Sequence, residues 1–469
     1  LEGAVDLNST LTVAGAVSLA STLSVGGAAN FLSTVTVVGN TRLGAIVSVV
    51  GAANFASTVT VVGAAHLQST VSVGGAATFA STVTVVGAAH LQSTVSVGGA
   101  AVFADTVTVV GDGTFKSNVS VSGNLDITGN VSVAGTLFAA GGITYDGNVS
   151  VSGNLAVGGN VSIGGTLSVT GAVSLASTLS VGGASNFLST VTVVGNTRLG
   201  ALVSVVGAAN FASTVTVVGA AHLQSTVSVG GAATFASTVT VVGIGTFKDD
   251  VSVSGNTVLG GTLRVAGATS LEGAVDLNST LTVAGAVSLA STLSVGGAAN
   301  FASTVTVEGA AHLKAAVSVG GAAVFASTVT VVGIGTFKDD VSVSGNTVLG
   351  GTLRVVGATS LQGAVDLNST LTVAGAVSLA STLSVGGAAN FASTVTVVGI
   401  GTFKDDVSVS GNTVLGGTLR VAGATSLEGA VDLNSTLTVA GAVSLASTLS
   451  VGGAANFLST VTITGTNVQ

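Results

Sequence analysis

The amino-acid sequence repeats every six residues without interruption. From Gly3 to Thr464 it divides into 77 consecutive hexapeptides, with no residue inserted or deleted between them. In the consensus the third and fifth positions are mainly apolar, the second and fourth are small and polar, and the first is Gly or Ser. A period this regular constrains the fold more than any single motif can.

The fifth position gives the sharpest test of the period. It is every sixth residue from Leu7 to Ile463, and it is Val, Leu, Ile, Phe or Tyr everywhere except Ala139. All 28 charged residues avoid the third and fifth positions, as ionised groups must where side chains are desolvated. Two buried positions that flank one outward position predict a β-strand.

Fifteen of the 16 Phe residues and the only Tyr lie at the fifth position, and Phe138 is the exception. We therefore expect these aromatic side chains to define the core. They are Phe31, Phe55, Phe79, Phe103, Phe115, Phe187, Phe211, Phe235, Phe247, Phe301, Phe325, Phe337, Phe391, Phe403, Phe457 and Tyr145.

The first position predicts a corner in every hexapeptide. It is Gly or Ser in 70 of the 77 hexapeptides, and such residues favour tight bends. The exceptions are Ala45, Ala201, Ala315, Asp105, Asp249, Asp339 and Asp405. Short strands joined by corners cannot form long hairpins, but they can coil so that each lies parallel to a strand one layer away. The sequence predicts an all-β fold, a β-helix or β-solenoid that continues through residues 1–469 as one repeat shaft.

Three architectures fit this period. A single-chain left-handed β-helix uses three hexapeptides, about 18 residues, per coil, and a flattened solenoid uses about 12. In a trimeric triple-stranded β-helix, three copies of each hexapeptide form one layer. Duplicated blocks begin at Gly267, Gly357 and Gly423, and the offsets between duplicated blocks share only a factor of six. In the trimer, a duplication of any whole number of hexapeptides only adds complete layers, so the offsets favour the trimer.

The volumes of neighbouring core residues favour the same arrangement. Each fifth-position Phe has a small residue two places earlier, such as Ala29 before Phe31 and Gly245 before Phe247. A close-packed core needs a constant volume in each layer. Threefold symmetry would enforce that balance within one hexapeptide. We therefore prefer the homotrimer over the single-chain coil, although a local steric cause of the pairing stays open.

Composition excludes several functions. The mean hydropathy is +0.84, but no apolar run approaches the 18 to 20 residues, roughly, that a membrane-spanning helix needs. With 6% charged residues and a net charge of −8, the chain has no basic stripe for nucleic acid. Cysteine is absent, which rules out disulfides. Methionine is absent too, and we expect the chain to be a segment of a longer protein whose cap or tip domains lie outside it.

Uninterrupted strings such as residues 147–181, GNVSVSGNLAVGGNVSIGGTLSVTGAVSLASTLSV, resemble the repetitive shafts of bacteriophage tail fibres and related viral or bacterial surface fibres. The resemblance covers essentially the whole chain. It implies a homotrimeric structural shaft at the cell surface, outside the cell or on a virion, with the receptor-binding part elsewhere. The hexapeptides also resemble those of left-handed β-helix acyltransferases, but no loop carries the catalytic histidine of those enzymes. We expect no enzyme activity and no cofactor.

Two sets of residues are weak candidates for metal binding. The Lys-Asp-Asp triplets place carboxylates at corners, where three copies around an axis could bind Ca²⁺, although solvated corners are the simpler interpretation. These carboxylates are Asp249, Asp250, Asp339, Asp340, Asp405 and Asp406. Four histidines lie at outward fourth positions, where a trimer would gather them in rings, and solvated side chains are again the simpler interpretation. They are His66, His90, His222 and His312.

Two alternative functions stay open. One is a monomeric β-solenoid that forms a surface layer or a filament. The other is an ice-binding solenoid, because pairs such as Thr34 and Thr36, or Thr58 and Thr60, lie outward on one strand. Such T-x-T hexapeptides alternate with other types, so in a coil of three hexapeptides we expect them to scatter over three faces.

Overall fold

The fold is all-β. The computed structural model describes residues 2–464. Within that range each of the 77 hexapeptides forms one strand of three residues at its third to fifth positions, from β1 (Val5–Leu7) to β77 (Val461–Ile463), with successive strands starting six residues apart. The predicted β-solenoid class is confirmed. The described residues contain no helix long and apolar enough to cross a membrane.

Within each unit, a strand pairs in parallel with the strand three hexapeptides further along the same chain. β1 pairs with β4 (Leu23–Val25), so that Val5 lies beside Leu23. The Val5 N–H donates to the Thr22 carbonyl at 2.9 Å, and at the far end of a strand the Leu32 N–H donates to the Val13 carbonyl of the preceding turn at 2.9 Å. One turn therefore contains three hexapeptides and one strand from each of three parallel sheets.

The chain forms two compact units, Leu1–Ser237 (unit 1) and Thr238–Gln469 (unit 2). In unit 1, sheet A contains β1 and every third strand to β37 (Ala221–Leu223). Sheets B and C begin with the next two strands. They run from β2 (Leu11–Val13) to β38 (Val227–Val229) and from β3 (Val17–Leu19) to β39 (Ala233–Phe235). These 39 strands form 13 turns.

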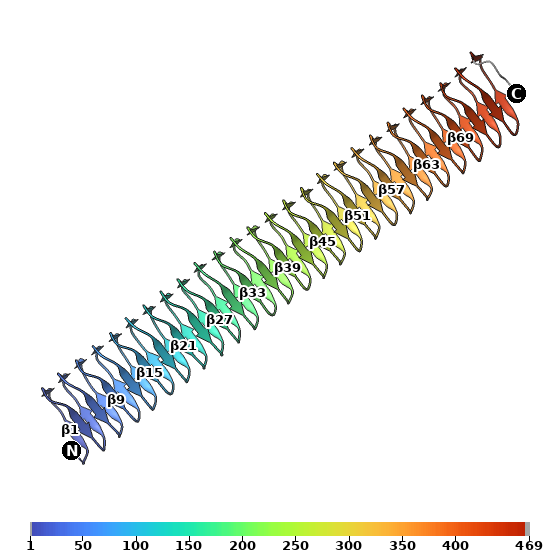
Figure 1. Ribbon diagram of the computed structural model, residues 1–469. Helices are drawn as coiled ribbons and strands as arrows, with labels where there is room; N and C mark the ends of the chain where they lie inside the picture. Colours follow the sequence, from blue (N-terminus) through green and yellow to red (C-terminus); the bar gives the residue numbers. More distant parts are fainter. Residues whose placement is uncertain (1, 465–469) are drawn as a thin grey trace. The chain divides into compact units, whose positions relative to one another are not determined.

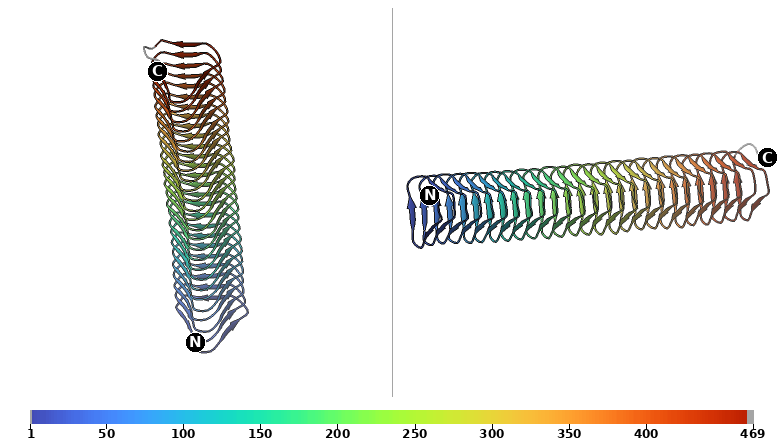
Figure 2. Two further views of the ribbon diagram at one scale, coloured as in Figure 1. Left: turned by 90° about the vertical axis from the view of Figure 1, so that its right-hand side faces the viewer. Right: turned by 90° about the horizontal axis from the view of Figure 1, so that it is seen from below.

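Unit 2 repeats the same arrangement. Its sheets A, B and C start at β40 (Val239–Val241), β41 (Gly245–Phe247) and β42 (Val251–Val253). Their last strands are β76 (Ala455–Phe457), β77 and β75 (Leu449–Val451). Figure 1 and the two views of Figure 2 show the strands of each sheet in successive, parallel turns within each unit.

The preferred three-chain arrangement is not what the structure has. In that arrangement each strand would pair with a strand of another chain, whereas within each unit here a strand pairs with the third strand after it in the same chain. The offsets between duplicated blocks are compatible with a single chain because the three sides of a turn are equivalent. A duplicated block simply moves to another side.

The pairing of large and small core residues also has a local cause. A Cβ atom added to Gly113 would lie 3.0 Å from Cε2 of Phe115 in its own hexapeptide and 3.3 Å from Cδ1 of Ile127. At Gly245 the same atom would lie 3.2 Å from Cε2 of Phe247. The ring thus lies against the third position of its own strand, so a small residue there is needed without any threefold symmetry.

The corners are where successive turns approach most closely. A Cβ atom added to Gly63 would lie 2.3 Å from the carbonyl carbon of Ala45, one turn earlier, and one added to Gly207 would lie 2.4 Å from that of Ser189. No described residue has a positive φ. The corner glycines are therefore required by the close approach of two backbones and not by a left-handed conformation.

This contact predicts the effect of filling a corner. Gly207→Ala would place its Cβ atom 2.6 Å from both the Ser189 carbonyl oxygen and the Thr190 nitrogen, so the two turns must separate. We expect a loss of about 1 to 3 kcal/mol in the free energy of unfolding, measured in urea by circular dichroism. The control is Ser189→Ala, where a Cβ atom is already present and the change should stay within about 0.5 kcal/mol. Equal effects of the two variants would contradict the steric explanation.

Candidate functional site

The aromatic residues singled out in the sequence lie inside the turns. All of the fifth-position Phe side chains are buried except Phe457, which is half-buried near the last described turn. Tyr145 is the largest fully buried side chain, with 1% of its surface exposed. These residues fill the interior and leave none of their polar chemistry accessible.

Tyr145 brings a phenol into this core. Its hydroxyl has no hydrogen-bond partner within the described structure. Burial raises the pKa of the Tyr145 phenol well above its usual range, because the ionised form would be desolvated. Nine hydroxyl groups at third positions are likewise buried without a partner among the described residues. They belong to Thr41, Ser185, Thr197, Thr257, Thr269, Thr347, Thr359, Thr413 and Thr425.

The Lys-Asp-Asp triplets lie at three separate corners of unit 2. The first and second precede β42 and β57 (Val341–Val343) at the corner between sheets B and C. The third precedes β68 (Val407–Val409) at the corner between sheets A and B. Five turns separate the first triplet from the second, and three and two-thirds turns separate the second from the third. The structure does not bring the three pairs of carboxylates together.

Each of these carboxylates already accepts a backbone hydrogen bond. Asp249 Oδ1 accepts from the Asp250 N–H at 3.0 Å, and Asp250 Oδ1 accepts from the Ala268 N–H of the next turn at 2.7 Å. Asp339 and Asp340 repeat this arrangement, with 2.7 Å between Asp340 Oδ1 and the Ala358 nitrogen. So do Asp405 and Asp406. The second Asp of each triplet therefore links its corner to the corner of the next turn.

The four histidines are spread over different sheets. His66 lies on sheet B and His90 on sheet C, at the outward positions of their strands. His222 lies on sheet A of unit 1, and His312 lies on sheet A of unit 2. Within residues 2–464, no three His, Asp or Glu side chains form a group that could hold a metal ion.

Asparagines at second positions form a set of corner contacts that the sequence reasoning missed. Asp112 Oδ1 accepts from the Asn130 N–H at 2.7 Å, Asn130 Oδ1 from the Asn148 N–H at 3.0 Å, and Asn148 Oδ1 from the Thr166 N–H at 2.9 Å. The signal was present in the spacing, because each of these residues is 18 positions from the next. The amides bridge successive turns, as the Asp residues of the triplets do.

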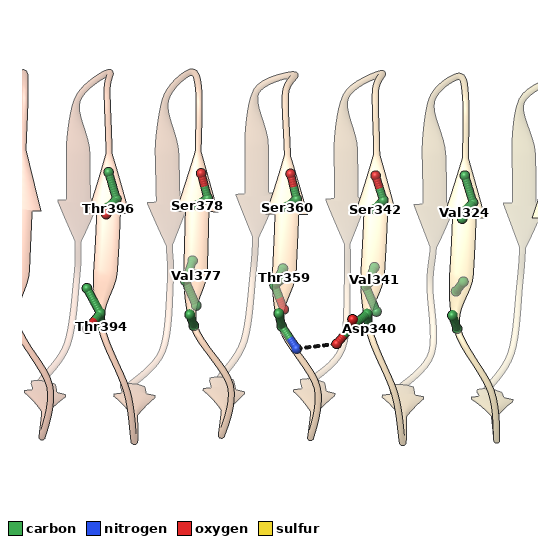
Figure 3. A pocket seen from close by; sticks show the side chains of 14 residues that line it. Val324, Asp340, Val341, Ser342, Thr359, Ser360, Val377, Ser378, Thr394 and Thr396 are labelled. Atoms are coloured by element: carbon green, nitrogen blue, oxygen red, sulfur yellow. Dashed lines mark hydrogen bonds between the residues drawn. The ribbon is translucent and has the colours of Figure 1, made fainter.

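Shallow grooves are the second feature that sequence reasoning missed. One, of about 410 Å³, runs across sheet C from Val324 to Thr396, between a row of second-position residues and a row of fourth-position residues. Figure 3 shows Ser342, Ser360 and Ser378 in line along it, with Asp340 at its edge. A copy of about 500 Å³ lies on sheet B, in the next duplicate of the same segment. These grooves are lined mainly by methyl and hydroxyl groups, and the Asp residue in each is held by its corner hydrogen bond.

The T-x-T hexapeptides do not gather on one side. Thr36 lies in β6 (Val35–Val37) on sheet C, and Thr34 immediately precedes that strand. Thr60 lies in β10 (Val59–Val61) on sheet A, and Thr58 immediately precedes that strand. The expected scatter over the faces is what the structure has.

These features define a β-solenoid with three parallel sheets and three hexapeptides in each turn. A comparison with protein-family models finds no match, and comparisons with curated proteins and with solved structures find none either.

The corner hydrogen bonds predict how the triplets respond to substitution. Asp340→Asn keeps the oxygen that accepts from Ala358, as Asn346 does for Ala364 at 2.9 Å, and should leave the urea midpoint unchanged. Asp340→Ala removes that acceptor and should cost about 0.5 to 1.5 kcal/mol. Added Ca²⁺ should not change the midpoint of any of these proteins. A Ca²⁺-dependent stabilisation that Asp340→Asn abolishes would instead establish a metal site.

Tyr145 predicts a pH dependence of stability. An unfolded tyrosine ionises at about pH 10, whereas the folded protein keeps the phenol neutral at that pH. The stability contributed by the neutral phenol is complete below that pH and decreases as the pH rises above it. Because Tyr145 is the only tyrosine and there is no Trp, absorbance at the phenolate wavelength reports this site alone. We expect the phenolate to appear together with unfolding. A phenolate signal at the pH of a free tyrosine, with intact circular dichroism, would contradict the burial.

Proposed function

We propose that this chain is the shaft of a structural fibre and acts as a rigid spacer in a viral tail fibre or a cell-surface appendage or adhesin. The observation that carries the proposal is the uniformity of the turns. In both units the turns have the same three short strands and hydrogen bonds to the neighbouring turns, and the turns between the first and last described strands have a filled core. Such a structure sets a distance between its two ends without needing specialised chemistry.

The character of the surface supports this function over an enzyme. The grooves described above are open and lined mainly by Ala, Ser and Thr side chains. Thr359 and Thr425 each line one of these grooves, but their hydroxyl groups are buried from solvent. A catalytic site needs a nucleophile or an acid and base gathered in a pocket, and the described residues place none together.

The proposed role includes partners and a location. The shaft would lie outside the cell, on a cell surface or on a virion, and terminal cap or tip domains outside this chain would provide attachment and recognition. Self-association into a homotrimer, which the resemblance to tail fibres implies, would then join chains at the level of the whole fibre. A monomeric surface or filament-forming solenoid is the alternative, because each turn already closes within one chain.

A deletion tests the spacer role and the number of chains together. Removing residues 267–356 takes out five whole turns and joins two identical block boundaries. In the virus or cell that carries the gene, immunogold labelling should decorate surface fibres, and the deletion should shorten them by about 24 Å at a strand spacing of about 4.8 Å.

The other outcomes are distinct. A shortening of about 72 Å would mean that each hexapeptide forms a layer of three chains. Labelling inside the cell, or fibres whose length does not change, would contradict the spacer role. The control is Ser342→Ala on the outer side of sheet C, which should leave both fibre length and attachment unchanged.

A further inference from the structure

Exposed valines recur in pairs on one side of unit 2. Val242 and Val332 are each 60% exposed, and Val258 and Val348 are each 37% exposed. Each pair occupies two successive turns of sheet A, and the two pairs are five turns apart. An exposed apolar cluster that recurs at a fixed spacing is a candidate for an interaction surface.

We define the sheet A stripe as two adjacent rows in seven successive turns of unit 2. One row is the outward middle residue of each strand, and the other is the corner residue two positions later. The strands are β40, β43 (Thr257–Leu259), β46 (Val275–Leu277), β49 (Leu293–Val295), β52 (Ala311–Leu313), β55 (Val329–Val331) and β58 (Thr347–Leu349).

The stripe has an ordered pattern of chemistry. Two apolar turns, which carry Val242 and Val258, are followed by an acidic turn with Asp276. The next turn, with Ser294 and Gly296, has the smallest side chains. It is followed by a basic turn that carries His312 and Lys314, and then by the second pair of apolar turns. The acidic and basic turns therefore lie symmetrically about the turn of Ser294.

We propose that the sheet A stripe binds a second copy of this chain in antiparallel orientation, with the twofold axis at the turn of Ser294. The inference goes beyond the spacer role and does not depend on it. It replaces the homotrimer that the resemblance to tail fibres implies with a dimer. Reversal about that axis places the Val242–Val258 pair of turns against the partner's Val332–Val348 pair, and it does so at both ends of the stripe.

The apolar side chains then interdigitate. The partner's Val332 faces Gly260, and Val242 faces the partner's Gly350, so that the two more exposed valines of each chain enter gaps left by glycines. Val258 and the partner's Val332 occupy the same layer side by side. Two such clusters form across a span of about 29 Å, and their burial provides the main attraction. At the centre Ser294 faces the partner's Ser294, where small residues allow close approach.

Charge complementarity selects this orientation. In the antiparallel pair the turn of Asp276 faces the partner's turn of His312 and Lys314, so each acid lies near a base. A parallel pair could also match the apolar turns. It would, however, place two Asp276 side chains in one layer and two Lys314 side chains in another, which is repulsive.

Charge exchange tests the orientation directly. Sedimentation velocity of the full chain over a range of concentrations should show a monomer–dimer equilibrium. Asp276→Lys and Lys314→Asp, each alone, should weaken the dimer by about tenfold or more, because two attractions become two repulsions. The double variant should restore it. The matched control is Asp432→Lys, which changes the same local sequence on sheet C and should have no effect.

A cysteine on the twofold axis tests the register. The chain has no Cys, so Ser294→Cys should form a disulfide-linked dimer under mild oxidation, whereas Ser288→Cys on sheet C of the same turn should not. Circular dichroism checks that every variant is folded. The proposal is overturned by a monomer at all concentrations, by a trimer, by a dimer that Asp276→Lys strengthens, or by equal crosslinking of the two cysteine variants.

Discussion

The contact between corners of successive turns is the constraint on which the fold depends. At Gly51 an added Cβ atom would lie 2.4 Å from the carbonyl carbon of Ser33, one turn earlier. A side chain added at this position would therefore collide with the backbone of the turn before. The sequence respects the limit throughout, since no two first-position residues other than glycine are three hexapeptides apart. In much of the chain, hexapeptides that begin with Gly alternate with hexapeptides that begin with Ser. Only a turn with an odd number of hexapeptides then places each Ser next to a Gly of the neighbouring turn. Two hexapeptides per turn would place Ser on Ser.

The same argument explains what the sequence could predict and what it could not. The period of six determined the strands, their inward residues and the parallel ladder. It did not distinguish a ladder between successive hexapeptides of three chains from one between every third hexapeptide of a single chain. The pairing of Gly113 with Phe115 was ambiguous for a related reason, since a ring against its own strand and a threefold layer demand the same small residue. Only the register, with Val5 beside Leu23, separates them.

The candidate site residues were harder to place than the core. Their position in the hexapeptide was clear from the sequence, and Asp250 does lie at a corner. Which of the three corners a residue occupies depends on how many hexapeptides complete a turn, and the sequence period alone does not give that number. The hydrogen bond from the Ala268 N–H to Asp250 could have been anticipated once three hexapeptides per turn were assumed. The grooves could not, because they arise from rows of small side chains that are distant in sequence.

Duplication lengths determine the surface of such a fold more than local sequence does. A copy displaced by five whole turns returns to the same sheet, so Asp276 and Asp366 both lie on sheet A. A further displacement by eleven hexapeptides, which is not a whole number of turns, moves the identical segment to sheet C, where Asp432 is followed by only one more described strand of that sheet. A self-complementary stripe therefore requires duplication by whole turns. The core tolerates a duplication of any whole number of hexapeptides. An interaction surface built from repeats keeps its residues on one sheet only when the duplicated length is a whole number of turns.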